Sequence, residues 1–264
     1  MFEEFLQRWD LAPDGDPVST RGSRLLPVRW RGQAAMLKIA LEPEEKSGQL
    51  LMEWWDGEGA ARVHARHGDA LLMERAQGDR SLSCMAAGGE DSAATRILCA
   101  AIARLHAPRG KAPPALVDLE NWFRALWPAA DAHGGLLSLA ADHAHALLAR
   151  AHAPVVLHGD IHHDNMLDFG GRGWLAIDPK GLQGERAFDY ANLFCNPEQF
   201  PRLAADRFTR RLDVVLEASG LERRRLLQWI VAWSGLSAAW WMEDGVAPAL
   251  DFEVMRCALA ALEA

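Results

Sequence analysis

The chain changes character once along its length, near Gln77-Gly78-Asp79, and this change constrains the fold more than any other feature. Before that point, short apolar runs bounded by turn residues indicate strands, with one helical segment among them. After it, long alanine- and leucine-rich stretches indicate helices. Strands gathered in one part of a chain and helices in the other predict an α+β fold, and they argue against the βαβ alternation of a doubly wound sheet.

In the strand-rich part, a hairpin is predicted around Arg31-Gly32-Gln33, with strands over residues 24 to 30 and 34 to 40. A short amphipathic helix over residues 1 to 10 is expected before it. Two further short strands are expected on either side of His67-Gly68-Asp69.

A helix is predicted between these two pairs of strands. Pro43 and acidic residues mark its start, and Gly57 marks its end, in the manner of ordinary helix start and stop signals. Leu50, Leu51 and Trp54 are expected to lie on one apolar face of this helix.

The remainder is predicted to be mostly helical, over residues 92 to 106, 118 to 130, 136 to 151 and from about 202 to the end. Strand signals return once, between 154 and 178. There an apolar run leads into a polar loop, and a small hairpin follows the loop.

Composition excludes several functions. The net charge is −8 and the pI is near 5.7, which argues against general binding to nucleic acids or anionic membranes, because both need basic patches. The four cysteines have no CxxC spacing and fit neither a disulfide framework nor a zinc ribbon. The N-terminus lacks the features of a signal peptide, and no apolar run approaches the roughly 18 residues of a membrane span. The protein is therefore expected to be soluble and cytoplasmic.

The polar loop within VVLHGDIHHDNMLDF, residues 155 to 169, is the densest chemical stretch of the chain. Its three histidines, His158, His162 and His163, are suitable ligands for a transition metal, so a zinc-dependent hydrolase is one interpretation. Such enzymes also take ligands from later in the chain. No histidine follows His163, although acidic residues such as Asp178 could contribute.

The same loop also has the parts of a phosphoryl-transfer site. Such a site needs a carboxylate for the attacking hydroxyl, oxygen ligands for Mg²⁺, and a lysine for the phosphates of ATP. Asn165 follows Asp160 by five residues, and Asp178 ends the second strand of the small hairpin. A hairpin brings Asn165 and Asp178 side by side, and Mg²⁺ prefers such hard oxygen donors.

Three segments, LHGDIHHDN, WLAIDPKG and GERAFDYANLF, together resemble the aminoglycoside phosphotransferase superfamily, which has a protein-kinase-like fold. The closer similarity is to its streptomycin 6-kinase and hydroxyurea phosphotransferase branch, and it covers about residues 20 to 245. The resemblance implies a two-lobed kinase-like fold. Its N-terminal nucleotide-binding lobe would span residues 1 to 76, and a helical C-terminal lobe with the catalytic loop and the acceptor site would span residues 77 to 264.

The resemblance also implies roles for residues of the polar loop and the hairpin. Asp160 would be the catalytic carboxylate that orients the acceptor hydroxyl, and His158 would brace the loop by hydrogen bonding. Asn165 and Asp178 would bind Mg²⁺. Lys180, two residues after Asp178, could touch a phosphate or the acceptor, or could be an ordinary exposed lysine.

The remaining cofactor-binding positions lie in the N-terminal part. Lys38 would contact the phosphates of ATP, with Glu45 as its partner on the helix, while Glu53 and Glu44 are alternatives to Glu45. Ser23 belongs to a segment that would cover the phosphates. Backbone groups at Glu74 and Ala76, in the hinge between the lobes, would hydrogen-bond adenine.

The implied function is ATP- and Mg²⁺-dependent transfer of a phosphate to a hydroxyl of a small molecule, with streptomycin or another cationic aminoglycoside as the preferred acceptor. Hydroxyurea or a metabolite is an alternative acceptor, and a nucleotide-binding pseudokinase is an alternative of another class. We expect a monomer or weak dimer without nucleic-acid or membrane partners. Structural and functional roles both stay open for His162, His163, Glu185 and Asp189.

Overall fold

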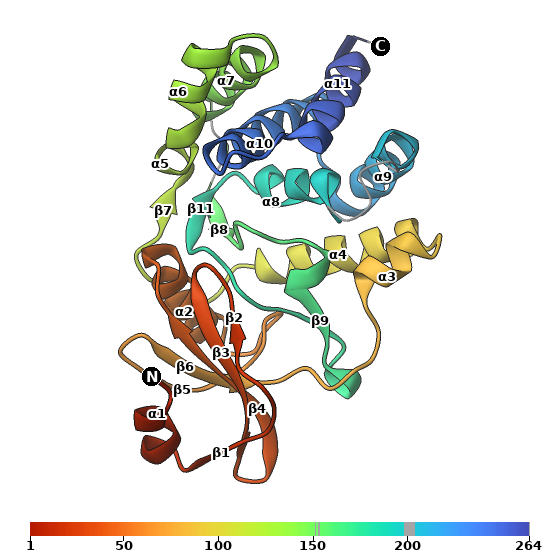
Figure 1. The fold of residues 1–264 in the computed structure, drawn as a ribbon. Helices are drawn as coiled ribbons and strands as arrows, with labels where there is room; N and C mark the ends of the chain where they lie inside the picture. The colour runs from red at the N-terminus through yellow and green to blue at the C-terminus, as the bar shows by residue number, and fades with distance from the viewer. Residues whose placement is uncertain (151, 153, 198–203, 264) are drawn as a thin grey trace.

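A computed structural model of the chain describes residues 1–150, 152, 154–197 and 204–263. It has an N-terminal lobe built around an antiparallel sheet and a larger, mostly helical C-terminal lobe (Figure 1). The predicted α+β class is confirmed, because strands dominate the first lobe and helices dominate the second.

The N-terminal sheet has the strand order β1-β3-β4-β6-β5, with β2 paired to β3, and every pair is antiparallel. The predicted hairpin forms between β3 and β4. Arg31 and Gly32 adopt positive φ angles there, as a tight two-residue hairpin turn requires. The strands are β1 (Leu11–Pro13), β2 (Val18–Ser19), β3 (Ser23–Trp30), β4 (Gln33–Ala40), β5 (Val63–His67) and β6 (Ala70–Glu74). Apolar residues of α1 (Glu3–Arg8) pack against this sheet.

Helix α2 (Pro43–Trp55) forms where it was predicted, but its predicted apolar face is wrong. Leu51 is buried as expected, whereas Leu50 is exposed and Trp54 is only half-buried. The buried apolar side chains beside Leu51 are Met52 and Trp55. The helix is rotated because two polar residues share its inward face: a carboxylate that pairs with a lysine and an amide that binds a backbone carbonyl.

The C-terminal lobe is built around α10 (Arg223–Glu243), in which most residues from Leu226 to Ala239 are buried. Helices α7, α8 and α11 pack around α10, while α4 packs against α9 (Figure 1). The helices of the lobe are α3 (Leu82–Ala87), α4 (Asp91–Leu105), α5 (Leu119–Trp122), α6 (Leu126–His133), α7 (Leu136–Leu148), α8 (Ala187–Asn192), α9 (Ala204–Ser219) and α11 (Ala249–Glu263).

The predicted helical stretches are found within the described residues, although residue 151 and residues 202–203 lie outside them. The stretch at 118 to 130 is divided into α5, a 3₁₀ turn η1 (Phe123–Ala125) and α6. No helix in the described part of the chain has the length and apolar character needed to cross a membrane.

Two small sheets hold the polar loop in place. Strands β9 (Met166–Asp168) and β10 (Trp174–Ala176) form the predicted small hairpin. Strand β8 (Val155–Leu157) pairs with β11 (Leu182–Gly184), which also pairs with β7 (Val117–Asp118). Backbone hydrogen bonds of 2.9 Å tie the end of β10 to the segment between α2 and β5 in the N-terminal lobe. The loop between β8 and β9 leads into this hairpin, so it lies at the junction of the lobes.

Candidate active site

A buried lysine on β4 connects the two lobes through carboxylates. Lys38 Nζ hydrogen-bonds Glu45 on α2 and also Asp178, which follows β10 and lies 140 residues further along the chain. Lys38 and Glu45 are both buried. The pair is local, because β4 leads directly into α2, whereas Asp178 reaches it only through the tertiary fold.

The other two candidate carboxylates of α2 have different partners. Glu53 accepts a hydrogen bond of 2.6 Å from Arg66 Nε, and Glu44 Oε1 lies 3.4 Å from Arg124 Nη2. Neighbouring residues on a helix point about 100° apart, so Glu44 cannot share the direction of the next residue. Of the three candidates, the structure brings only Glu45 to the lysine.

Asp178 has a φ of 61°, a left-handed conformation that is uncommon for residues other than glycine. The segment that follows packs tightly on α2, since a Cβ on Gly48 would lie 1.9 Å from the carbonyl oxygen of Pro179. Burial alone would raise the pKa of Asp178, but the charges of Lys38 and Lys180 hold that pKa well below its ordinary value. A charged carboxylate is therefore held in a strained backbone position, as is common at functional sites.

Lys180 lies among three carboxylates. Its Nζ donates to Glu45 Oε1 at 2.6 Å, and it lies 3.5 Å from Asp178 Oδ2 and 3.9 Å from Asp160 Oδ2. Burial alone would lower the pKa of Lys180, but these three carboxylates raise that pKa above its ordinary value. Lys180 is thus a largely buried, charged residue of the cluster and not an ordinary surface lysine.

The loop that carries Asp160 is held by a buried aspartate of α8. The Asp189 carboxylate accepts the backbone N–H groups of His158 and Gly159, each at 2.9 Å, and lies 2.8 Å from His106 Nε2. Burial alone would raise the pKa of Asp189, but the hydrogen bond and charge of His106 lower it overall. Asp189 therefore braces the loop from behind.

His158 ties the same loop to the hairpin. Its Nε2 lies 2.8 Å from the carbonyl oxygen of Ile177, so this nitrogen carries the proton, and its Nδ1 accepts the Asp160 N–H at 3.2 Å. Burial lowers the pKa of His158, and a neutral ring is what these two hydrogen bonds require. The structure thus places His158 where a brace would lie, against backbone groups on both sides.

Asp160 itself is half-exposed. Asn165 Nδ2 donates to the Asp160 carbonyl oxygen at 2.8 Å and lies 3.4 Å from its Oδ2, while Asn192 Nδ2 lies 3.4 Å from Oδ1. His162 Nε2 lies 4.0 Å from Oδ1. Asn192 was missed by the sequence reasoning, although it stands at the AN pair of GERAFDYANLF.

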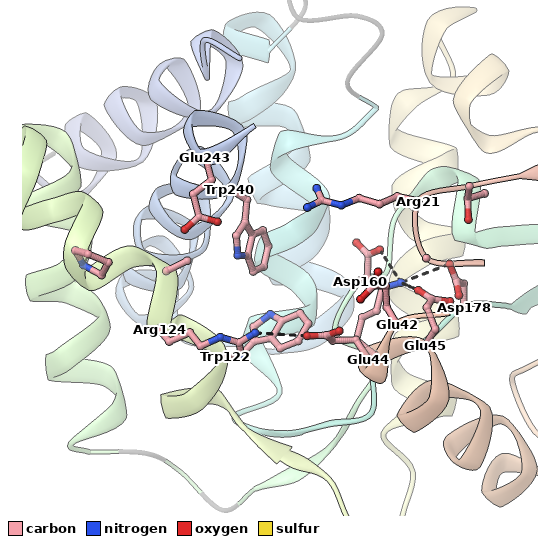
Figure 2. A pocket seen from close by; sticks show the side chains of 16 residues that line it. Arg21, Glu42, Glu44, Glu45, Trp122, Arg124, Asp160, Asp178, Trp240 and Glu243 are labelled. Atoms are coloured by element: carbon pink, nitrogen blue, oxygen red, sulfur yellow. Dashed lines mark hydrogen bonds and ion pairs between the residues drawn. The ribbon is translucent and has the colours of Figure 1, made fainter. Parts of the chain in front are cut away.

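Two cavities meet at this cluster. The smaller, of about 210 Å³, lies between the N-terminal sheet, α2 and the hairpin, and it is lined by Met73, Asn165 and Asp178 among others. The larger, of about 660 Å³, is bounded by α2, the α5–η1 segment and the end of α10, and Asp160 lines its wall (Figure 2). Asp178 lines both cavities, so molecules bound in the two would meet beside it.

The loop histidines do not form a zinc centre. The described residues contain no group of three or more histidine, cysteine or acidic side chains placed to hold a metal ion. Asn165 and Asp178 instead present hard oxygen atoms to the smaller cavity, which suits Mg²⁺ completed by phosphate oxygens and water. Asn165 uses its Nδ2 on Asp160, which leaves its Oδ1 as the atom for a cation.

Of the other predicted cofactor-binding positions, one lines the smaller cavity and two do not. Ser23 lines the smaller cavity and donates to Glu45 Oε2 at 3.0 Å. Met73 also lines this cavity, whereas Glu74 and Ala76, which follow it, are not among its lining residues. The Glu74 side chain accepts a hydrogen bond from Arg172, which lies between the two strands of the small hairpin.

The larger cavity has aromatic walls that no sequence motif marked. The rings of Trp122 and Trp240 meet edge to face with centroids 5.6 Å apart, and both line the cavity (Figure 2). Glu185, by contrast, lies outside this cavity and pairs with Arg225.

Fold and site together define a phosphotransferase with a kinase-like fold, because a lysine–glutamate pair, a loop aspartate and a carboxylate–amide pair converge between a sheet lobe and a helical lobe. A solved structure agrees with this fold. The ternary complex of a thermostable variant of aminoglycoside phosphotransferase APH(4)-Ia with ADP and hygromycin B superposes with a TM-score of 0.61, at 16% identity, over 99% of this chain and 96% of that one.

The sequence identifies the family. The model of the aminoglycoside/hydroxyurea antibiotic resistance kinase family matches residues 8–245, and the chain belongs to this family. It is 50% identical to streptomycin 3''-kinase of Klebsiella pneumoniae over 91% of this chain and 92% of that protein. It is 35% identical to streptomycin 6-kinase of Streptomyces glaucescens over 95% of this chain and 85% of that protein. The resemblance found in the sequence motifs is therefore confirmed.

Proposed function

We propose that this protein transfers the γ-phosphate of ATP to a hydroxyl group of streptomycin, with Mg²⁺ as cofactor, and so inactivates the antibiotic. The observation that carries the proposal is the 50% identity with a streptomycin 3''-kinase over nearly the whole chain. Identity with a streptomycin 6-kinase is lower, at 35%. This difference favours the 3''-hydroxyl over the 6-hydroxyl as the acceptor, a choice that the sequence motifs left open.

The smaller cavity is the proposed nucleotide site. Adenine would bind backbone groups at Glu74 and Ala76, next to Met73, and the segment around Ser23 would cover the phosphates. Lys38 would neutralise the phosphates while Glu45 fixes its direction, as their buried pairing supports. Asn165 and Asp178 would hold Mg²⁺, which supplies positive charge against the phosphate oxygens when it is bound.

The larger cavity is the proposed acceptor site, with Asp160 in its wall. Asp160 would orient the acceptor hydroxyl and take its proton as the new oxygen–phosphorus bond forms. The bond from the γ-phosphorus to the bridging oxygen breaks, and ADP leaves. Lys180, 3.9 Å from Asp160, would balance the negative charge that gathers between the two cavities. Catalysis would thus come mainly from positioning and fixed charges.

We extend the proposal to the whole chain. The nucleotide-binding lobe would span residues 1 to 76 and the acceptor lobe residues 77 to 264. The protein would act in the cytoplasm, where ATP is available, as a monomer or weak dimer. Cell fractionation and light scattering of the purified protein test these two statements.

The central test follows phosphate transfer from ATP to streptomycin, with the modified hydroxyl located by NMR of the product. We expect transfer to the 3'' position, and a fall of about 10²- to 10⁴-fold in kcat for Asp160→Ala. Asp213→Ala, an exposed aspartate on α9, is the matched control and should keep full activity. Undiminished turnover by Asp160→Ala contradicts the role of this residue. Transfer to hydroxyurea but not to streptomycin contradicts the acceptor.

A further inference from the structure

Two ion pairs join the lobes at the larger cavity. Arg21, in the turn between β2 and β3, donates from Nη1 to both carboxylate oxygens of Asp244, at 3.0 and 2.8 Å, just after α10. Arg124 of η1 has its Nη2 3.4 Å from Glu44 Oε1, in the first turn of α2. Figure 2 shows Arg21 extending over the cavity from one side and the Arg124–Glu44 pair on another.

Neither pair can contribute much to folding. The side chains of Arg21 and Asp244 are 83% and 46% exposed, and those of Arg124 and Glu44 are 68% and 36% exposed. Exposed ion pairs stabilise proteins little, because water and side-chain entropy offset their attraction. Such pairs can therefore be exchanged for other partners at small cost.

The cavity between these pairs is rich in carboxylates. Glu42 and Glu243 line it together with Glu44, and within the described residues neither Glu42 nor Glu243 has an ion-pair partner within 4.0 Å. Asp244 lines an adjoining cavity of about 240 Å³, which shares Asp160 and Trp240 with the larger one. The guanidinium groups of the two arginines thus act as counter-ions within an acidic, tryptophan-lined space.

The acceptor of the proposed function carries the same chemical group, since streptomycin has two guanidinium groups on its cyclitol. We propose that Glu44 and Asp244 bind cationic groups of the acceptor, and that Arg21 and Arg124 occupy these carboxylates in the free enzyme as internal competitors that the acceptor displaces. A guanidinium fork fits a carboxylate whether it belongs to the protein or to a ligand. The inference rests on the proposed function, because it takes a guanidinium-bearing molecule as the occupant of this cavity.

The inference predicts that loss of either arginine strengthens the binding of streptomycin. Arg21→Gln and Arg124→Gln should each tighten streptomycin binding by about two- to fivefold, because each removes a competitor of the strength of an exposed ion pair. The double variant should multiply the two gains. Glu44→Gln and Asp244→Asn should weaken binding by about fivefold or more, because they remove a charge-assisted contact. The KM for ATP should stay unchanged in all of them.

Calorimetry with streptomycin in the absence of nucleotide measures binding, and a coupled assay measures transfer separately. Arg66→Gln is the matched control, because Arg66 forms an ion pair of 2.6 Å with Glu53 away from both cavities and its loss changes the net charge equally. Streptomycin that binds more weakly to the arginine variants, or no more tightly than to Arg66→Gln, overturns the inference. So does a raised KM for ATP in Arg21→Gln, which would assign this arginine to the phosphates.

The two failures can be told apart. Transfer without an arginine effect on binding leaves the proposed function standing and removes the inference. Streptomycin binding that responds to the arginine variants, without phosphate transfer, leaves the inference standing and removes the proposed function. Absence of both binding and transfer contradicts both.

Discussion

Lys180 contributes a positive charge where carboxylates of both lobes converge. We therefore expect it to take part in catalysis and not merely to lie beside Asp178, the predicted metal ligand. Lys180→Gln should lower kcat by about 10²-fold, because a fixed charge would be lost where negative charge gathers during transfer. The KM for ATP should change little. Steady-state kinetics with varied ATP and acceptor measures both parameters.

Lys46→Gln is the matched control for this prediction. Lys46 lies on α2 as an exposed lysine paired with Asp69 at 2.8 Å, so its loss removes the same charge outside the cluster. A rise in the KM for ATP with unchanged kcat in Lys180→Gln would show that this lysine only binds nucleotide.

We expect His163 to make the fold sensitive to acid. It is buried, and in the described part of the chain neither ring nitrogen has a hydrogen-bond partner. Burial lowers the pKa of His163 to about 2, whereas in the unfolded chain it is about 6.5. Below pH 6.5 the unfolded state therefore binds a proton that the folded state does not. The stability is complete above this pH and is lost as the pH falls toward 2.

This linkage costs roughly 2 kcal/mol of unfolding free energy between pH 6.5 and pH 5. In His163→Leu that part of the pH dependence should disappear, while exposed His133→Leu should keep it. Urea unfolding at the two pH values measures the difference. Equal pH dependence in His163→Leu and in the native protein would contradict the assignment.

At the scale of elements, the contact between α2 and the end of the small hairpin sets the geometry of the site. Gly48→Ala places a Cβ 1.9 Å from the Pro179 carbonyl oxygen, so the helix and the hairpin must separate. Glu45 would then move from Lys38 and Lys180. We expect kcat/KM to fall by about 10²-fold, since misplacement by about 1 Å can cost that much.

Overpacking should also lower the stability of Gly48→Ala by about 1–3 kcal/mol. Gly171→Ala is the control, because a Cβ at that position meets nothing within 4 Å and its φ is not left-handed. Activity and chemical unfolding are measured on both variants. Native activity in Gly48→Ala would show that the close approach of α2 does not position the cluster.

Long elements and the small hairpin of β9 and β10 could be predicted from the sequence, whereas short strands that depend on distant partners could not. Strands β3 and β4 and helix α4 are long enough to show their period. Strands β7 and β11 have two and three residues. They exist because β11 lies between β7 and β8 and pairs with both. The face of α2 was predicted from its apolar residues alone, and this failed because a buried ion pair also sets the rotation of the helix.

At the scale of the molecule, nucleotide bound between the lobes should stabilise both. A non-hydrolysable ATP analogue with Mg²⁺, at about 100 times its Kd, should add about 2.7 kcal/mol. This corresponds to a rise of about 5 to 10 °C in Tm for a chain of this size. Removal of Mg²⁺ with EDTA should abolish most of the rise and stop transfer. A rise that is unaffected by EDTA would contradict the metal assignment of Asn165 and Asp178.

The proposed reactive centre could be anticipated because its main residues lie in two short motifs joined by one hairpin, around Asp160 and Asp178. The proposed acceptor cavity could not, because its walls come from six separate segments of the chain. Arg21, Glu44, Trp122 and Trp240 each come from one of them. No spacing rule connects residues that meet only after both lobes have folded.

The shared wall at Asp178 has a consequence for inhibition. A single molecule that joins a nucleoside to an aminocyclitol could fill both cavities, because they open on the same residue. Once its first half is bound, the second half acts at a high effective concentration, and so the affinity can exceed that of either half by a large factor. Its kinetic signature is competition with ATP and with the antibiotic together, a pattern that no ligand of one cavity can produce.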